Sequence, residues 1–228
     1  MDSIAVGSLG LGILKKGSEF SIQQARQRLR TLQGRFPAYV ASGGTDYINR
    51  SRDYDTVNPS ESAPRGLIGS ANKTIQLSQQ DLNGACALSP RHDARLYEIL
   101  AKKLDENVNI RIAVSPPPQG LGPGLAYSNM KALSEISDLL IGELATRRLS
   151  GTSRNDKAAQ GAAVAAAKVV LRRNVQLAAF RSSEKPKWGN GEPYLLHSKV
   201  IVVDDSAFYI GSDNLYPSWP QEYGYIRR

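Results

Sequence analysis

The stretch YLLHSKVIVVDDSAFYIGSDN, residues 194–214, decides much of the fold. Its part 195–203 ends in four consecutive β-branched residues, which is typical of a strand buried on both sides. A second run at 207–210 indicates another strand, and the acidic pair Asp204-Asp205 lies in the short segment between them. The sequence therefore predicts two strands joined by a tight acidic turn.

Strands and helices alternate on the N-terminal side of this stretch. The hydrophobic pattern predicts further strands at 73–79, 109–114 and 175–180, and helices at 63–70, 91–104, 128–149 and 156–173. The two middle helices each carry an apolar stripe, formed by Leu96, Ile99, Leu100 and Leu104 in one and by Leu133, Ile136, Leu140 and Leu144 in the other. This alternation predicts an α/β fold, an α-β-α sandwich with a central mixed β-sheet.

The first part of the chain is less regular. An amphipathic helix is expected from Ser21 to Arg35, and the polar stretch Asn49–Ser62 indicates a linker. We therefore expect residues 1–58 to be the tail of a preceding domain plus a linker. Residues 59–228 are then the main domain, cut short at its C-terminal end.

Composition excludes several classes of protein. A chain of 228 residues with 41% hydrophobic residues is neither disordered nor too short for a core. We expect no signal peptide, because the apolar N-terminus is interrupted by glycines and lacks a basic start. We also expect no transmembrane segment, because no apolar run approaches roughly 20 residues, and hence a soluble or peripheral protein. The lone Cys86 cannot form an internal disulfide. The net charge of +8 suits anionic partners such as phosphodiesters, nucleic acid or membrane surfaces, although it also fits a merely soluble surface.

The chemistry concentrates around one histidine. His197 and Lys199 are two residues apart on an expected strand, so they point to the same face. A histidine can attack or protonate an anionic phosphorus centre, while a fixed ammonium stabilises charge on its oxygens. Gly211 permits a sharp turn after the next strand, so that Ser212 and Asn214 can offer neutral donors to the same phosphate.

These residues match the signature H-x-K-x4-D-x6-G-S-x-N at every fixed position from His197 to Asn214. The chain thereby resembles the phospholipase D superfamily. The segments 215–219 and 222–226 resemble the murine-toxin type of phospholipase D more closely than the nuclease type. The likeness covers most of residues 60–228, and 73–80 resembles the first strand of the family's second, C-terminal half-domain.

The resemblance implies a role for each site residue. His197 is one of two active-site histidines, of which one forms a phosphohistidine and the other protonates the leaving alcohol. Lys199, Ser212 and Asn214 bind the phosphate. Asp204 belongs to the catalytic motif, although this aspartate is more often structural than chemical. Glu222 is similar to a carboxylate that orients a histidine. The chemistry requires neither a metal nor another cofactor.

Each of these roles has a simpler alternative. Taken alone, His197 and Lys199 would be ordinary surface residues, and Glu222 an exposed carboxylate. His92 lies outside any H-x-K pattern and is expected at the N-terminus of a helix. Trp188 and Trp219 either line a substrate mouth or pack within the protein.

The chain has two histidines, and one of them lies in the motif. Because a complete site in this superfamily uses two motifs, the second comes either from a homodimer or from an upstream domain, and the latter is favoured. The function expected is a phosphodiesterase that hydrolyses or transfers phospholipid headgroups, with a phospholipid or another phosphodiester as substrate and peripheral membrane contact. The alternatives are a metal-independent endonuclease of the same superfamily, or an incomplete half-site that only binds phosphate or a partner domain.

Overall fold

A computed structural model describes residues 38–43, 59–83, 92–115, 133–149, 155–180, 189–190, 196–212, 214–216 and 222–227. The strands are β1 (Ala38–Gly43), β2 (Thr74–Gln79), β3 (Asn109–Val114), β4 (Val175–Ala179), β5 (Lys199–Val203), β6 (Ala207–Gly211) and β7 (Glu222–Arg227). The helices within these ranges are α4 (Pro59–Gly69), α5 (Ala94–Asp105), α6 (Ser134–Arg148) and α7 (Lys157–Asn174).

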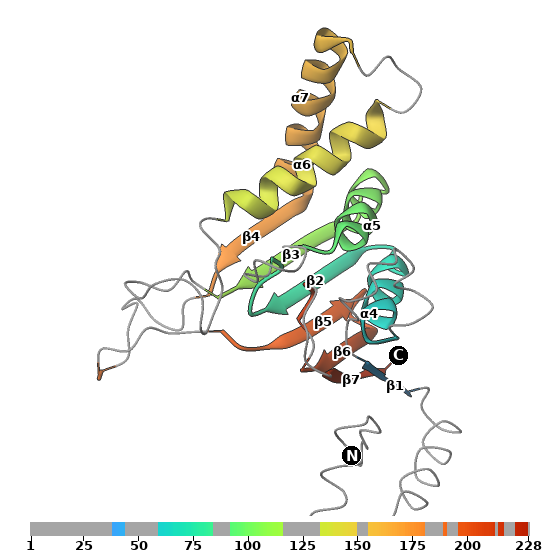
Figure 1. The fold of residues 1–228 in the computed structure, drawn as a ribbon, viewed down its shortest axis with the longest axis vertical. Helices are drawn as coiled ribbons and strands as arrows, with labels where there is room; N and C mark the ends of the chain where they lie inside the picture. Colours follow the sequence, from blue (N-terminus) through green and yellow to red (C-terminus); the bar gives the residue numbers. More distant parts are fainter. Residues whose placement is uncertain are drawn as a thin grey trace, which may run out of the picture.

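The strands form one mixed sheet in the order β1-β7-β6-β5-β2-β3-β4 (Figure 1). β2, β3 and β4 run parallel, because helices connect each of them to the next. The other neighbours pair antiparallel, and β5 and β6 are joined by the expected acidic turn. The α/β fold around a central mixed sheet is therefore confirmed.

The hydrophobic core lies on one face of the sheet. Ile75 pairs with Ile110, and Leu77 pairs with both Ile112 and Ile201, so that these buried side chains share a face. Buried residues of α4, α5, α6 and α7 belong to the same cluster. On the opposite face the side chains are partly or fully exposed, for example Phe208 in β6.

The carboxylate of Asp93 caps the start of α5 and also binds α4. The Asp93 carboxylate accepts hydrogen bonds from the backbone N–H of Arg95 (3.0 Å) and of Leu96 (3.3 Å), so α5 starts at Ala94. Arg65 of α4 is almost completely buried, and its Nε lies 3.3 Å from the same carboxylate, which ties the two helices together.

The alanine-rich helix α7 reaches beyond the sheet (Figure 1). Asp156 caps it by accepting hydrogen bonds from Ala158 and Ala159. Its small buried residues, Ala163 and Ala167, pack against the rest of the protein, and most other side chains are exposed. None of the helices in the described ranges is both long enough and apolar enough to cross a membrane.

Several bounds differ from those expected from sequence. β5 begins at Lys199 rather than residue 195, because the last ladder pair of β5 with β2 joins Lys199 to Gln79. Residues 38–43 lie in the segment assigned to a preceding domain and a linker, yet they pair with β7 as an edge strand of the main sheet. The helix expected at 21–35 lies outside the described residues. The remaining domain division stays a prediction.

Candidate active site

The motif residues converge at one edge of the sheet. The ladder pairs Gln79 with Lys199 at the end of β2, and Val200 with Ile210 near the end of β6. The C-terminal ends of β2 and β6 therefore meet the N-terminal end of the antiparallel β5. His197, Lys199 and the segment that begins at Gly211 consequently share this edge.

Lys199 holds a buried ammonium group beside His197. Its side chain lies on the core face, and the residue is 4% exposed. Its Nζ donates to the backbone carbonyl of His197 at 3.1 Å and to Oε1 of Gln80 at 3.3 Å. A cation this well shielded from water acts on a neighbouring anion more strongly than an exposed lysine would.

His197 itself is exposed, as a group that meets a substrate must be. The partial loss of water around its ring lowers the pKa of His197, and the neighbouring Lys199 ammonium lowers it further. Both effects favour the neutral imidazole at neutral pH. A neutral ring keeps a lone pair with which it can attack phosphorus or accept a proton.

Two polar atoms at this edge accept no hydrogen bond from the part of the chain that the structure describes. They are Oδ1 of the partly buried Asn214 and Oε1 of the fully buried Gln79. Burying such an atom without a partner is costly, so these atoms mark a place suited to a polar ligand. If the carboxamide group of Asn214 is rotated by about 180°, its Nδ2 donor takes the position of Oδ1.

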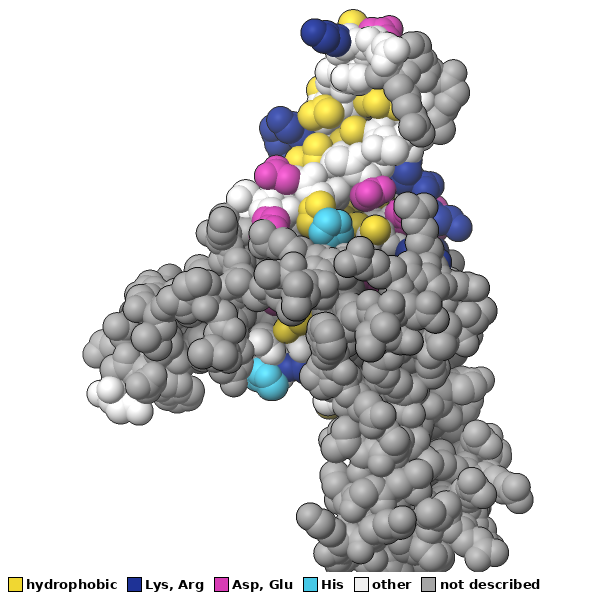
Figure 2. Space-filling model, viewed as in Figure 1, with side chains coloured by type: hydrophobic (Ala, Val, Ile, Leu, Met, Phe, Trp, Pro, Cys, Tyr) yellow, Lys and Arg dark blue, Asp and Glu magenta, His cyan; other side chains and the backbone are white. Residues whose placement is uncertain are grey.

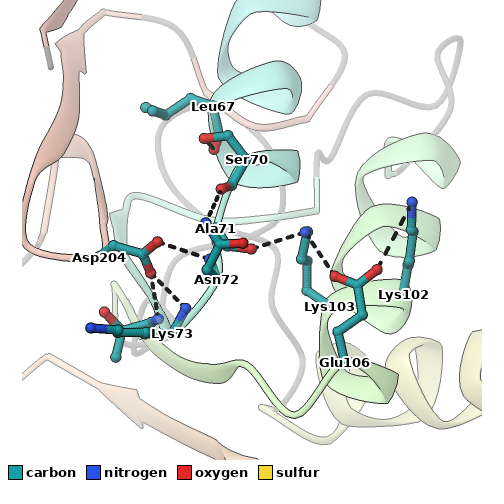
Figure 3. A network of polar contacts seen from close by, with 10 residues as sticks. Leu67, Ser70, Ala71, Asn72, Lys73, Lys102, Lys103, Glu106 and Asp204 are labelled. Atoms are coloured by element: carbon teal, nitrogen blue, oxygen red, sulfur yellow. Dashed lines mark hydrogen bonds and ion pairs between the residues drawn. The ribbon is translucent and has the colours of Figure 1, made fainter.

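The motif aspartate lies at the other end of β5. Asp204 is seven residues beyond His197, on the order of 20 Å along an extended strand. Its carboxylate accepts hydrogen bonds from the backbone N–H of Asn72 (2.8 Å), Lys73 (2.7 Å) and Thr74 (2.8 Å), as Figure 3 shows for the first two. Asp204 therefore lies far from His197, although both belong to one sequence motif. Its carboxylate instead stabilises the start of β2 through these three hydrogen bonds.

The electrostatics of Asp204 agree with this position. Desolvation raises the pKa of its carboxyl group, but the hydrogen bonds from Thr74, Asn72 and Lys73 outweigh it, so the pKa is lowered overall. The segment just before β2 has a second anchor, because the ammonium of Lys103 donates a hydrogen bond to the carbonyl of Ala71 at 2.9 Å (Figure 3).

Glu222 begins β7, two strands away from β5. Adjacent strands are about 4.8 Å apart, so its backbone lies roughly 10 Å from β5 at the motif's edge of the sheet. Gly224 keeps β7 close to β6, since a Cβ atom there would overlap the ring of Tyr209. The Glu222 side chain lies outside the described parts, as do Cys86, Trp188 and Trp219 entirely.

His92 belongs to a different part of the protein. It forms an isolated bridge with Asn83, and its ring packs edge-on against Tyr97 with the centroids 5.5 Å apart. The two histidines of the chain lie apart on the face drawn in Figure 2 (cyan). The structure therefore brings one histidine, His197, to the motif's edge.

Sequence analysis missed three polar residues at this edge, Ser78, Gln80 and Ser115, which contact the motif segment. One local pattern pointed to two of them. Ser78-Gln79-Gln80 are polar at three consecutive positions, whereas the strand before them alternates between buried apolar and partly buried polar residues. Buried uncharged polar residues are uncommon in such a strand and indicate a polar environment at its end.

The charged side chains visible over α5, α6 and α7 are of both signs (Figure 2). Examples are the pairs of Asp105 with Arg147 (3.1 Å) and with Arg148 (2.7 Å). On this face, the described side chains thus show mixed charge rather than one continuous basic surface.

No family model matches the chain. Among curated proteins, it is 45% identical over 229 residues to a phospholipase D of Streptomyces antibioticus, with 98% of this chain aligned. The chain spans 37% of that relative's length. Solved structures that resemble it include Nuc of Salmonella typhimurium, a phospholipase D family member (TM-score 0.40, 13% identity, 83% of this chain and 81% of that one). Another is the phosphatidylserine synthase of Haemophilus influenzae (TM-score 0.45, 15% identity, 83% and 34%).

Proposed function

Because this chain belongs to the phospholipase D superfamily, we propose that it supplies one half of the active site of a phosphodiesterase that acts on phospholipid headgroups. The observation that carries the proposal is the pairing of an exposed His197 with the buried ammonium of Lys199 at the edge that also bears Asn214. The substrate class is supported by the identity to a protein named phospholipase D.

The reaction proceeds in two displacements on phosphorus. In the first, a ring nitrogen of one histidine attacks the phosphorus and the bond to the leaving alcohol breaks, while a second histidine donates a proton to that alcohol. In the second, water or another alcohol gives a proton back to this second histidine, and its oxygen attacks the phosphorus. The bond between phosphorus and the first histidine then breaks, which releases that histidine and the product. Lys199 stabilises the charge on the non-bridging oxygens throughout, and Ser212 and Asn214 donate to them.

The in-line geometry requires histidines on opposite sides of the phosphorus. His197 takes one of the two roles, and the other falls to a second motif in an upstream domain or in a second copy of the chain. A carboxylate that orients the histidine holds one ring tautomer and stabilises the imidazolium, and Glu222 is our candidate for it. This route needs no metal ion.

Choline release from phosphatidylcholine vesicles tests the proposal. The 228-residue chain alone, kept monomeric as judged by light scattering, should be inactive or nearly so. Activity should appear when a second motif-bearing half is supplied by dimerisation or by an upstream domain. A strictly monomeric species with full turnover would overturn the two-half arrangement.

A metal-independent nuclease is the second candidate, favoured by the net charge of +8. Plasmid nicking in excess EDTA, run beside the choline-release assay, separates the two. Nicking without choline release would support the nuclease, and release without nicking would support the phospholipase. Loss of both activities in EDTA, restored by magnesium or zinc, would contradict the histidine mechanism.

A further inference from the structure

The segment that carries His197 is held in place by side chains rather than by the strand ladder. Residues 196–198 precede β5, whose ladder with β2 ends at the pair Gln79 and Lys199. The Ser198 hydroxyl lies 2.7 Å from the hydroxyl of Ser78, and the backbone N–H of Leu196 donates to Oγ of Ser115 at 3.2 Å.

Gln80 adds a contact to the catalytic ammonium itself. Its Oε1 accepts a hydrogen bond from Nζ of Lys199 at 3.3 Å, and the two residues are 5% and 4% exposed. The Gln80 backbone is fixed as well, because its carbonyl accepts from the N–H of Ser115 at 3.1 Å. The glutamine is therefore a buried, anchored acceptor rather than a flexible surface side chain.

A neutral acceptor has a specific advantage at this position. A buried ammonium needs hydrogen-bond acceptors, because it has lost water. A carboxylate would satisfy it but would also cancel its charge, and would compete with an anionic substrate. A carboxamide oxygen accepts one N–H of the ammonium and adds no negative charge of its own beside the substrate.

We propose that Gln80 is a positioning residue that aims the ammonium of Lys199 at the substrate phosphate. This role rests on the proposed function of Lys199 in phosphate binding. Gln80 does not touch the substrate, and it acts through Lys199.

Inorganic phosphate and a double-mutant cycle test this role on the full chain. The phosphate dissociation constant is measured from the ring signals of His197 in NMR titrations, and these signals are assigned by their loss in His197→Asn. Gln80→Met keeps the length of the side chain but removes the acceptor, and should weaken phosphate binding by about ten-fold. In a Lys199→Met background the same change should have no further effect, because nothing is left to position.

Gln76→Met is the matched control. Gln76 lies in β2, which ends one residue before Gln80, and donates one side-chain hydrogen bond to Asp205 (2.9 Å) toward the opposite end of that strand. It should leave the phosphate affinity unchanged. If Gln80→Met melts too early for titration, Gln80→Asn, one methylene shorter, replaces it in the cycle.

The outcomes separate the two proposals. Unchanged phosphate affinity in the Gln80 variant, or an equal loss in both backgrounds, overturns the positioning role while the proposed function stands. A Lys199→Met variant that binds phosphate as well as the parent chain overturns the proposed function, and the role of Gln80 with it.

Discussion

The two ends of β5 carry residues of one motif but present opposite chemistry. At the Asp204 end, one carboxylate accepts three backbone hydrogen bonds of 2.7 to 2.8 Å from the start of β2. At the His197 end, the histidine is exposed, the neighbouring ammonium is buried, and the buried Oδ1 of Asn214 accepts no hydrogen bond from the described residues.

We expect this contrast to divide the motif into residues that stabilise the fold and residues that act on a substrate. Polar groups whose hydrogen bonds are completed within the fold stabilise that fold, and a ligand gains little from them. Polar groups held rigidly but left incomplete are ready to bind a ligand without rearrangement. The predictions below test whether the two ends of β5 divide in this way.

The largest effect is expected at the His197 end. His197→Asn should lower turnover by about three orders of magnitude or more in the complete assembly, because it removes the nucleophile or the proton donor. The melting temperature should change little, since this side chain is exposed. Choline release and thermal unfolding are measured on the same preparations.

His92→Asn provides the control for this loss, since it removes the other histidine of the chain. Its ring packs against the buried Tyr97, so any effect should be on stability rather than on turnover per folded molecule. If the His197 variant retained more than about a tenth of the activity, the motif assignment would be wrong.

Elements with a complete local pattern were predictable from sequence. β3 has the bounds expected for it, because apolar residues alternate from Asn109 to Val114 and a proline run follows. In α6, the expected residues Ile136, Leu140 and Leu144 are buried. His197, Lys199 and Asn214 were likewise identified from the spacing of the motif, whereas the polar residues that contact the motif segment were not.

Contacts between distant segments were not predictable, because nothing local encodes them. The partners of Asp204 lie about 130 residues earlier, and Gln80 lies 119 residues before Lys199. The strand β1 depends on pairing with β7, almost the length of the chain away. A short segment such as Ala38–Gly43 gains its strand conformation from that neighbour rather than from its own propensity.

A variant of Glu222 tests whether the active site at the His197 end of β5 includes a residue of β7, two strands away. If its carboxylate orients a histidine, Glu222→Gln should lower kcat by roughly ten-fold or more, with little change in KM. Steady-state kinetics of the complete assembly measure both constants. An unchanged kcat would show that Glu222 does not orient a histidine and is an ordinary surface carboxylate.

The Asp204 end should respond in stability rather than in chemistry. Asp204→Asn keeps a residue that tolerates the positive φ of 53° but removes the charge, and should cost on the order of 2 kcal/mol of unfolding free energy. Asp205→Asn is the matched control, because Asp205 has the same φ and accepts one exposed hydrogen bond from Gln76. Urea unfolding should show a clearly smaller loss for the control.

The pH dependence of this stability follows from the lowered pKa of Asp204. A carboxyl group with a lower pKa in the folded state stabilises the fold above its unfolded pKa, and this stability is lost as the pH falls through the folded pKa. The difference in unfolding free energy between the parent chain and Asp204→Asn should therefore shrink on acidification. A difference that stayed constant down to strongly acidic pH would show that the charge of Asp204 contributes nothing.

The smallest effect concerns the pKa of His197. Desolvation is the larger cause of its lowering and the Lys199 ammonium the smaller one, so Lys199→Met should raise the pKa without restoring the ordinary value. NMR titration of the ring measures this directly, without any substrate. Lys73→Met is the control, since Lys73 is an exposed cation at the Asp204 end of β5 and should leave the His197 titration unmoved. If both variants shifted the pKa equally, the coupling would come from the net charge of the protein, and the local pairing of His197 with Lys199 would not account for it.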